Sequence, residues 1–232
     1  MKNLWFDMDG VMTVYDIALY TTEKAGGTPP FLVPRSHVFA TLAENPNLMK
    51  AFNELYQEYR DDPKVSVNVL TSIPVGLLQA EHTLDKFEWC RKHIENFSPE
   101  DFYCVSVPKH DAVIDFLWPL TKNDILVDDY PKNLTNWVRR GGTAVKCVNG
   151  INSYNDLYTC IDTRWDPEEI VKTLKEVIGQ WSRTEKNRQS ECLFFVCFRS
   201  AVSSISLPSF RVPLRLLSLC ISPVSEKDRA AW

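Results

Sequence analysis

The chain has 232 residues, of which 44% are apolar and 24% are charged, and its formal net charge is -4. These values lie near the averages of globular proteins, so they exclude collagen-like and intrinsically disordered chains and allow one continuous core. The mildly acidic balance also argues against nucleic acid as a partner, because a phosphate-binding surface needs clustered Lys and Arg.

The first predicted strand runs from Lys2 to Phe6 and stops at a turn rich in carboxylates, Asp7-Met8-Asp9-Gly10. Residues 14–62 then combine Gly and Pro pairs with two stretches of helix-spaced apolar residues, Ser36 to Ala43 and Asn47 to Tyr59. We interpret residues 14–62 as a small helical cap inserted after the first strand.

Beyond residue 62 the sequence alternates between β-branched runs and helical patterns joined by short connections. This alternation predicts a parallel sheet with helices on both faces, which is a Rossmann-like α/β fold. The predicted core domain comprises residues 1–13 and 63–182. Its further strands are expected at residues 65–70, 102–107, 124–127 and 143–148, and its helices at 77–96, 111–118, 133–140 and 167–180.

The composition changes at residue 183, and we leave residues 183–232 out of the predicted fold. This segment is rich in Ser and basic residues, contains no Gly, and keeps neither helical nor strand periodicity for long. A disordered extension, a segment that docks on a partner or a membrane surface, and a product of a shifted reading frame or mis-spliced message all fit this composition. We expect a chain that ends at Ser182 to keep its activity.

The sequence carries no signal for export or membrane insertion. The N-terminal segment reaches Asp7 too early to hold the apolar core of a secretory signal, and no apolar run is long enough to cross a bilayer. The seven cysteines include no Cys-x-x-Cys pair, which indicates reduced, structural thiols. We therefore expect a cytoplasmic protein without a membrane partner.

Polar residues follow the carboxyl ends of four predicted strands. These residues are Asp7 and Asp9, Thr71, Lys109, and the pair Asp128-Asp129. Ligands of open parallel sheets bind at this edge. We therefore expect these side chains to form one site.

These residue types suit phosphoryl transfer. Of two neighbouring carboxylates, one can attack phosphorus while the other hands a proton to the leaving oxygen. Mg²⁺ would neutralise the gathered charge, and Asp128-Asp129 supplies the second acidic cluster that it needs. Thr71 and Lys109 offer a hydroxyl and a positive charge to the phosphate. A calcium loop is disfavoured, because Ala18 stands where such a loop needs Glu. Each residue alone could equally be a cap, a turn or a surface charge, so the order of the set carries the argument.

Four segments resemble, in order, the motifs of the haloacid-dehalogenase-like superfamily. They are Asp7-Met8-Asp9-Gly10-Val11, Thr71-Ser72, Lys109 and Ile125-Leu126-Val127-Asp128-Asp129. The resemblance implies that Asp7 is the nucleophile and Asp9 the general acid and base. It further implies that Asp7, the backbone carbonyl of Asp9 and the pair Asp128-Asp129 hold Mg²⁺.

A narrower resemblance covers about residues 1–180 and is to the 5'(3')-deoxyribonucleotidases and the bacterial and phage-type 5'-nucleotidases. It rests on Leu4 to Val11, Leu70-Thr71-Ser72 and Asp128 to Leu134, and it continues through Asn149-Gly150-Ile151-Asn152. It implies hydrolysis of nucleoside monophosphates to nucleoside and phosphate, and it is compatible with a homodimer. Thr71 and Lys109 would hold the phosphate, with assistance from Ser72.

Two alternatives stay open at this stage. The first is a phosphatase that acts on sugar phosphates or other small phosphorylated metabolites, and the second is a catalytically silent binding module. The cap gives no base or sugar preference, since the aromatic residues Tyr15, Tyr20, Phe31 and Phe39 suit either a stacked base or a small core.

Overall fold

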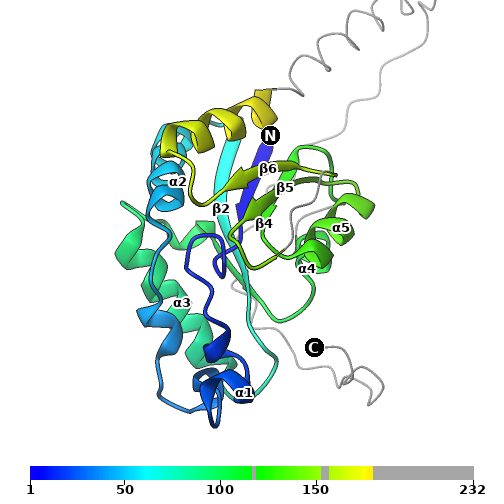
Figure 1. The fold of residues 1–232 in the computed structure, drawn as a ribbon. Helices are drawn as coiled ribbons and strands as arrows, with labels where there is room; N and C mark the ends of the chain where they lie inside the picture. The colour runs from blue at the N-terminus through cyan, green and yellow to red at the C-terminus, as the bar shows by residue number, and fades with distance from the viewer. Residues whose placement is uncertain (117–118, 153–156, 180–232) are drawn as a thin grey trace, which may run out of the picture. The chain divides into compact units, whose positions relative to one another are not determined.

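The computed structural model describes residues 1–116, 119–152 and 157–179. Within these residues a single parallel sheet has the strand order β3-β2-β1-β4-β5-β6, which confirms the predicted Rossmann-like α/β fold (Figure 1). Its strands are β1 (Lys2–Phe6), β2 (Val65–Ser72), β3 (Phe102–Val105), β4 (Asp124–Asp128), β5 (Thr143–Val148) and β6 (Thr159–Asp162).

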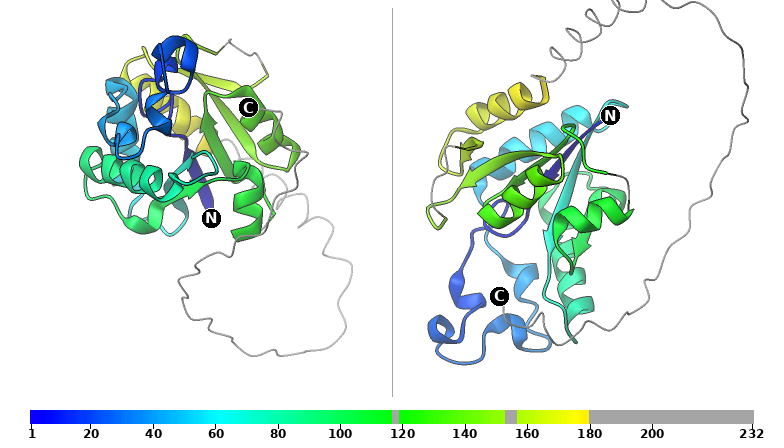
Figure 2. Two further views of the ribbon diagram at one scale, coloured as in Figure 1. Left: turned by 90° about the horizontal axis from the view of Figure 1, so that it is seen from below. Right: turned by 90° about the vertical axis from the view of Figure 1, so that its right-hand side faces the viewer.

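Helices cover both faces of the sheet. The described α-helices are α1 (Thr22–Ala25), α2 (Pro46–Tyr59), α3 (Gln79–His93), α4 (Lys109–Phe116), α5 (Pro131–Arg139) and a helix over residues 167–179. Figure 2 shows α4 and α5 on one side of the sheet, and α2 with the helix over residues 167–179 on the other. The two layers explain why the central strands are apolar along almost their whole length.

Side chains of β1 alternate between the two faces. Leu4 and Phe6 pack into the larger core cluster with α2 and the helix over residues 167–179, whereas Trp5 packs into the smaller cluster with α4 and α5. All three side chains are at most 1% exposed. The strand is therefore fixed by apolar contacts on both sides, and the turn that follows it is held at a defined place.

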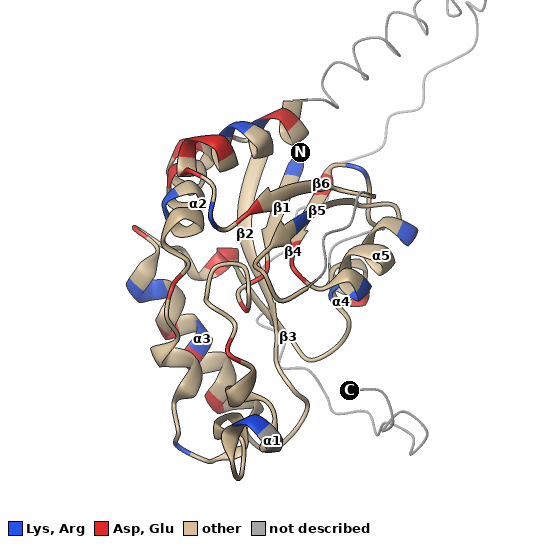
Figure 3. Cartoon of the chain, in the orientation of Figure 1, with Lys and Arg blue, Asp and Glu red and all other residues tan. Residues whose placement is uncertain are grey.

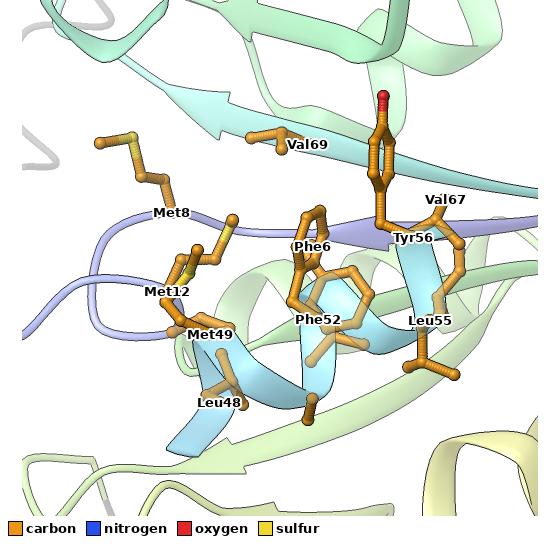
Figure 4. Close-up of a cluster of buried hydrophobic side chains, with 14 of the residues drawn as sticks. Phe6, Met8, Met12, Leu48, Met49, Phe52, Leu55, Tyr56, Val67 and Val69 are labelled. Carbon is orange, nitrogen blue, oxygen red and sulfur yellow. The ribbon is translucent and has the colours of Figure 1, made fainter. Parts of the chain in front are cut away.

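Helix α2 packs against the sheet, although it lies in the segment that we predicted as cap. The Phe52 ring contacts the Phe6 ring edge-on at a centroid distance of 4.9 Å, and Leu48, Leu55 and Tyr56 join the same cluster (Figure 4). The division into a cap of residues 14–62 and a core stays a prediction, and this packing favours an insertion that ends before Pro46.

Ion pairs link α2 to the helix over residues 167–179. Lys175 Nζ lies 2.5 Å from Glu58 Oε2 and 3.8 Å from Glu54 Oε1. Both helices carry acidic as well as basic residues (Figure 3). The exposed pairs add little stability by themselves, so apolar packing holds this layer to the sheet.

Within residues 14–45 the structure has a short α-helix, α1, and three 3₁₀ helices, η1 (Ile17–Leu19), η2 (Pro30–Leu32) and η3 (Val38–Thr41). The helix that we expected from Ser36 to Ala43 is thus reduced to a 3₁₀ turn. A further 3₁₀ helix, η4 (Pro99–Asp101), precedes β3. Strand β6 was not predicted. None of the described helices is long and apolar enough to span a membrane.

Several expectations fall on residues outside the described ranges. These are the end of the helix that we predicted at residues 111–118, the last residue of the helix at 167–180, and the whole segment of residues 183–232.

Candidate active site

The candidate site lies where the chain order of the strands reverses direction across the sheet. β1 pairs in parallel with β2 on one side and with β4 on the other. Asp7 directly follows β1, and Asp128 is the last residue of β4. Loops that leave two such neighbouring strands run in opposite directions and open a crevice between them, where ligands of this architecture bind.

Lys109 forms ion pairs with two carboxylates of the site. Its Nζ lies 2.7 Å from Asp7 Oδ1 and 2.7 Å from Asp128 Oδ2, and all three side chains are buried. Burial lowers the pKa of Lys109, but the charges of Asp128 and Asp7 outweigh burial and raise the pKa above its usual value. Asp128 is held further by the backbone N–H of Tyr130 and the amide of Asn133, at 2.7 and 3.0 Å. Lys109 therefore stays a cation in a fixed position.

Asp129 is oriented by residues of β5 and of the connection that follows it. The amides of Asn149 and Asn152 each donate a hydrogen bond to Asp129 Oδ2 at 2.8 Å. The buried ammonium of Lys146 donates to the backbone carbonyl of Asp129. The two amides hold the carboxylate and Lys146 holds the backbone, so Asp129 has little freedom to turn away from the site.

Gly10 allows the first turn to approach Asp129 closely. Its φ is 76°, in the left-handed region that residues with a Cβ rarely adopt. A Cβ at this position would lie 2.6 Å from Asp129 Oδ2 and 2.8 Å from Asn149 Nδ2. The Asn149 amide also donates to the Gly10 carbonyl at 2.8 Å. A side chain of any kind would therefore push the two acidic loops apart.

Three buried carboxylates form a group whose ligand atoms lie within 4.8 Å of one another. They belong to Asp7, Asp128 and Asp129. Burial raises the pKa of Asp7, and burial together with the charge of Asp128 raises the pKa of Asp129 to about 6. Gathered carboxylates of this kind are costly without a cation, and hard oxygen atoms are the ligands that Mg²⁺ prefers. The donor set therefore fits the predicted magnesium ion.

A second buried lysine, Lys86 on α3, joins the remaining predicted residues. Its Nζ forms an ion pair with Asp9 Oδ2, and it donates to Thr71 Oγ1 and to the backbone carbonyl of Ser72, each at 2.9 Å. Lys86 is 0% exposed, whereas the Asp9 side chain is 19% exposed. Asp9 is thus more exposed than the other carboxylates of the site, although its Oδ1 is buried.

Our sequence analysis missed Lys86. A weak signal was present, because Lys86 shares the buried stripe of α3 with His82, Trp89 and Cys90, at helical spacing from each. A lysine on such a stripe is unusual unless it has a partner. The carboxylate that pairs with Lys86 belongs to Asp9, however, which lies 77 positions away in the chain. The sequence alone therefore did not identify the pair.

Aromatic rings of the inserted segment lie near Asp9. Tyr15 and Tyr20 stack with a centroid distance of 5.0 Å, and Tyr20 contacts Phe31 and Phe39 at 5.8 and 6.1 Å. Burial, followed by the charge of Asp9, raises the pKa of Tyr20. The four aromatic residues that we singled out from the sequence therefore form one cluster beside the Asp9 carboxylate.

No protein-family model matches the sequence, and no curated protein matches it. Among solved structures, a D,D-heptose 1,7-bisphosphate phosphatase from B. bronchiseptica, complexed with magnesium and phosphate, has a TM-score of 0.47 at 13% identity over 76% of this chain and 99% of that chain. A protein from Mesorhizobium loti described as a HAD-like phosphatase has a TM-score of 0.43 at 13% identity, over 77% and 86% of the two chains. A haloacid-dehalogenase-like family hydrolase from Xanthomonas campestris has a TM-score of 0.50 at 11% identity, over 79% and 98%.

The chain has the fold of the haloacid-dehalogenase-like hydrolases. In this fold the predicted residues form two hydrogen-bonded groups at one edge of the sheet. Lys109 joins Asp7 to Asp128, with Asp129 beside them, and Lys86 joins Asp9 to Thr71 and Ser72. The Asp9 carboxylate is not in the group of three candidate metal carboxylates, and the expected contribution of its backbone carbonyl stays a prediction. The catalytic roles of these residues remain predictions.

Proposed function

We propose that the chain is a Mg²⁺-dependent phosphomonoesterase that hydrolyses ribo- or deoxyribonucleoside monophosphates to nucleoside and phosphate. The observation that carries this proposal is the buried Asp7 carboxylate at the end of β1, in contact with Lys109 and grouped with Asp128 and Asp129. A carboxylate held in place at a ligand-binding crevice, beside a fixed cation, suits nucleophilic attack on a phosphate ester.

Asp7 is the proposed nucleophile. Its carboxylate oxygen forms a bond to phosphorus while the ester bond from phosphorus to the nucleoside oxygen breaks, which leaves an aspartyl phosphate and a free nucleoside. Lys109 lies against Asp7 and offsets the charge that the phosphoryl group brings into this buried place. Asp7, Asp128 and Asp129 would hold Mg²⁺, which would supply electrostatic stabilisation of the phosphoryl oxygens.

Asp9 is the proposed general acid and base. It gives a proton to the departing nucleoside oxygen, and it later takes a proton from the water that hydrolyses the aspartyl phosphate. The greater exposure of the Asp9 side chain suits this role, since the leaving group departs on the side opposite the attacking carboxylate. Lys86 holds Asp9 in that position, and Thr71 and Ser72 lie in the same hydrogen-bonded group to receive the phosphate.

The aromatic cluster supports a nucleotide as substrate. Tyr15 and Tyr20 are partly exposed and lie in a segment that contacts the leaving-group side of the site. Aromatic faces bind planar bases by stacking, which sugar phosphates without a base cannot exploit. We therefore place nucleoside monophosphates ahead of sugar phosphates as substrates.

A phosphate-release assay tests this proposal. Purified protein is incubated with ribo- and deoxyribonucleoside monophosphates, sugar phosphates and other phosphorylated metabolites, with Mg²⁺ or with a chelator. We expect release from nucleotides only with Mg²⁺. Asp7→Asn should lower kcat by several orders of magnitude, because the amide keeps the shape but cannot attack. Asp61→Asn, which changes an exposed acid outside the site, is the matched control and should retain activity.

Each outcome separates the hypotheses. Undiminished release by the Asp7→Asn variant would refute the nucleophile. A preference for sugar phosphates over every nucleotide would favour the alternative phosphatase, and no release from any substrate by folded wild-type protein would favour the silent binding module.

A further inference from the structure

Three potential metal ligands form a second group that shares no residue with the carboxylate cluster of the candidate active site. They are His37, which directly precedes η3, and Glu81 and Asp85, which lie on α3. One ligand atom from each residue falls within 4.8 Å of the others. The two carboxylates are four residues apart on one helix, so they project from the same face, one turn above the other.

The contacts within this group leave two carboxylate oxygens without partners. Asp85 Oδ1 lies 2.9 Å from His37 Nδ1, and Glu81 Oε2 accepts a hydrogen bond from the backbone N–H of Arg35 at 3.0 Å. Asp85 Oδ2 and Glu81 Oε1 are both buried and have no hydrogen-bond partner among the described residues. The Asp85 side chain is only 5% exposed. A buried carboxylate oxygen without a donor or cation is costly.

We propose that His37, Glu81 and Asp85 bind a divalent transition-metal ion, with Zn²⁺ as the best fit. Two atoms that bind one ion tetrahedrally at about 2.0–2.2 Å lie about 3.3–3.6 Å apart. His37 Nδ1 and Asp85 Oδ1, which are hydrogen-bonded at 2.9 Å, would therefore need to separate only slightly to admit it. The ion would give the carboxylates of Glu81 and Asp85, each of which has one buried oxygen without a partner, a cation to bind. It would also offset the repulsion between two acids that lie one helical turn apart. Water completes the shell, because the His37 side chain is 58% exposed and faces solvent.

The donor types distinguish this group from the carboxylate cluster of the active site. An imidazole nitrogen with two carboxylates suits Zn²⁺ or a related transition-metal ion, whereas Mg²⁺ prefers an all-oxygen shell. The site would cross-link the segment before η3 to α3, which also carries Lys86. Its role is to fix the inserted segment against the helix, and it is independent of the proposed phosphatase activity.

Zinc binding can be measured directly on the full chain without an affinity tag. The protein is stripped with a chelator and dialysed into excess Mg²⁺, which occupies the all-oxygen cluster, and Zn²⁺ is then titrated with calorimetry and metal analysis. We expect one zinc ion per chain and a higher melting temperature in its presence. Asp85→Asn and His37→Gln should each weaken zinc affinity by at least about tenfold, because each removes a ligand.

Controls separate a specific site from general effects. His93→Gln alters a histidine that contacts Glu44 outside the group, and it should leave zinc affinity unchanged. The X-ray absorption spectrum of the bound zinc should show one nitrogen ligand from imidazole with oxygen ligands. Equal zinc binding by wild-type protein and both ligand variants, or no zinc binding by folded wild-type protein, would overturn the proposal. Circular dichroism of each variant establishes that it is folded.

Discussion

Lys86 links Asp9, Thr71 and Ser72 of the candidate site to helix α3. Its buried ammonium contacts Asp9, Thr71 and the Ser72 carbonyl at once, so it fixes the turn after β1 relative to the end of β2. Asp9 has no other cation in contact among the described residues. The orientation of the proposed acid and base therefore depends on this lysine.

We predict that Lys86→Met lowers kcat by about 10²–10⁴-fold relative to the wild type, which approaches the effect of removing Asp9, the proposed general acid and base. The methionine fills the space but offers no donor, which frees Asp9 to leave its place. Steady-state kinetics, corrected for the folded fraction, measure the effect. Lys92→Met changes an exposed lysine on the same helix and should leave kcat unaltered. Equal kcat of the two variants would show that Lys86 only stabilises the fold.

Gly10 permits a contact that no other residue can reproduce. We predict that Gly10→Ala abolishes most activity and lowers the free energy of unfolding by at least about 1–2 kcal/mol, because φ is 76° and the added Cβ would overlap Asp129. Urea denaturation and the phosphate assay measure the two effects. Gly27→Ala is the control, since nothing lies within 4 Å of a Cβ there. A Gly10→Ala protein as stable and active as the control variant would contradict this account.

Helix α2 carries much of one core face, as its contact with β1 indicates. We predict that Phe52→Ala lowers the free energy of unfolding by about 3–5 kcal/mol, because the ring is fully buried against Phe6. Chemical denaturation measures the change. Lys50→Ala, on the exposed side of the same helix, should change stability by no more than about 0.5 kcal/mol. Similar small effects in both variants would indicate that α2 is a detachable part of the cap.

Most elements could be predicted because periodicity and strand composition are local signals. The strands over residues 2–6 and 143–148 agree with β1 and β5, and the helix expected at residues 133–140 corresponds to α5. Strand β6 was not predicted because it has only four residues, two of which are not buried, so its apolar pattern is too short to recognise. The packing of α2 against the sheet was not predicted for a different reason. An apolar stripe shows that a helix is buried, but it does not show against what.

The sequence identified those residues of the candidate site that lie in short motifs at the ends of predicted strands. Topology brings Asp7 and Asp128 together, and topology follows from the strand pattern. Lys86 and the group of His37, Glu81 and Asp85 could not be found in this way. Their contacts form where α3 packs against segments that have no regular periodicity. Local patterns encode elements, whereas contacts between irregular loops and helices depend on the folded whole.

At the level of the complete chain, we predict that a protein ending at Ser182 keeps the kcat and KM of the full chain. Every residue of the candidate site lies between residues 7 and 152, and the last described helix ends at residue 179. The phosphate assay on both proteins measures the effect. Loss of turnover by a truncated protein that still shows the cooperative unfolding of the full chain would contradict this expectation.

The central position of β1 has a consequence for biosynthesis. The ribosome makes β1 (Lys2–Phe6) long before its neighbour β4, which begins at Asp124. At synthesis rates of about 5–20 residues per second, roughly 6–24 s pass before that neighbour exists. During this time the edge of β1 that will pair with β4 stays unpaired in the nascent chain, and such an apolar edge is a target for chaperones and for aggregation. A nascent chain released before Asp128 would therefore carry the proposed nucleophile without any means to hold its cation.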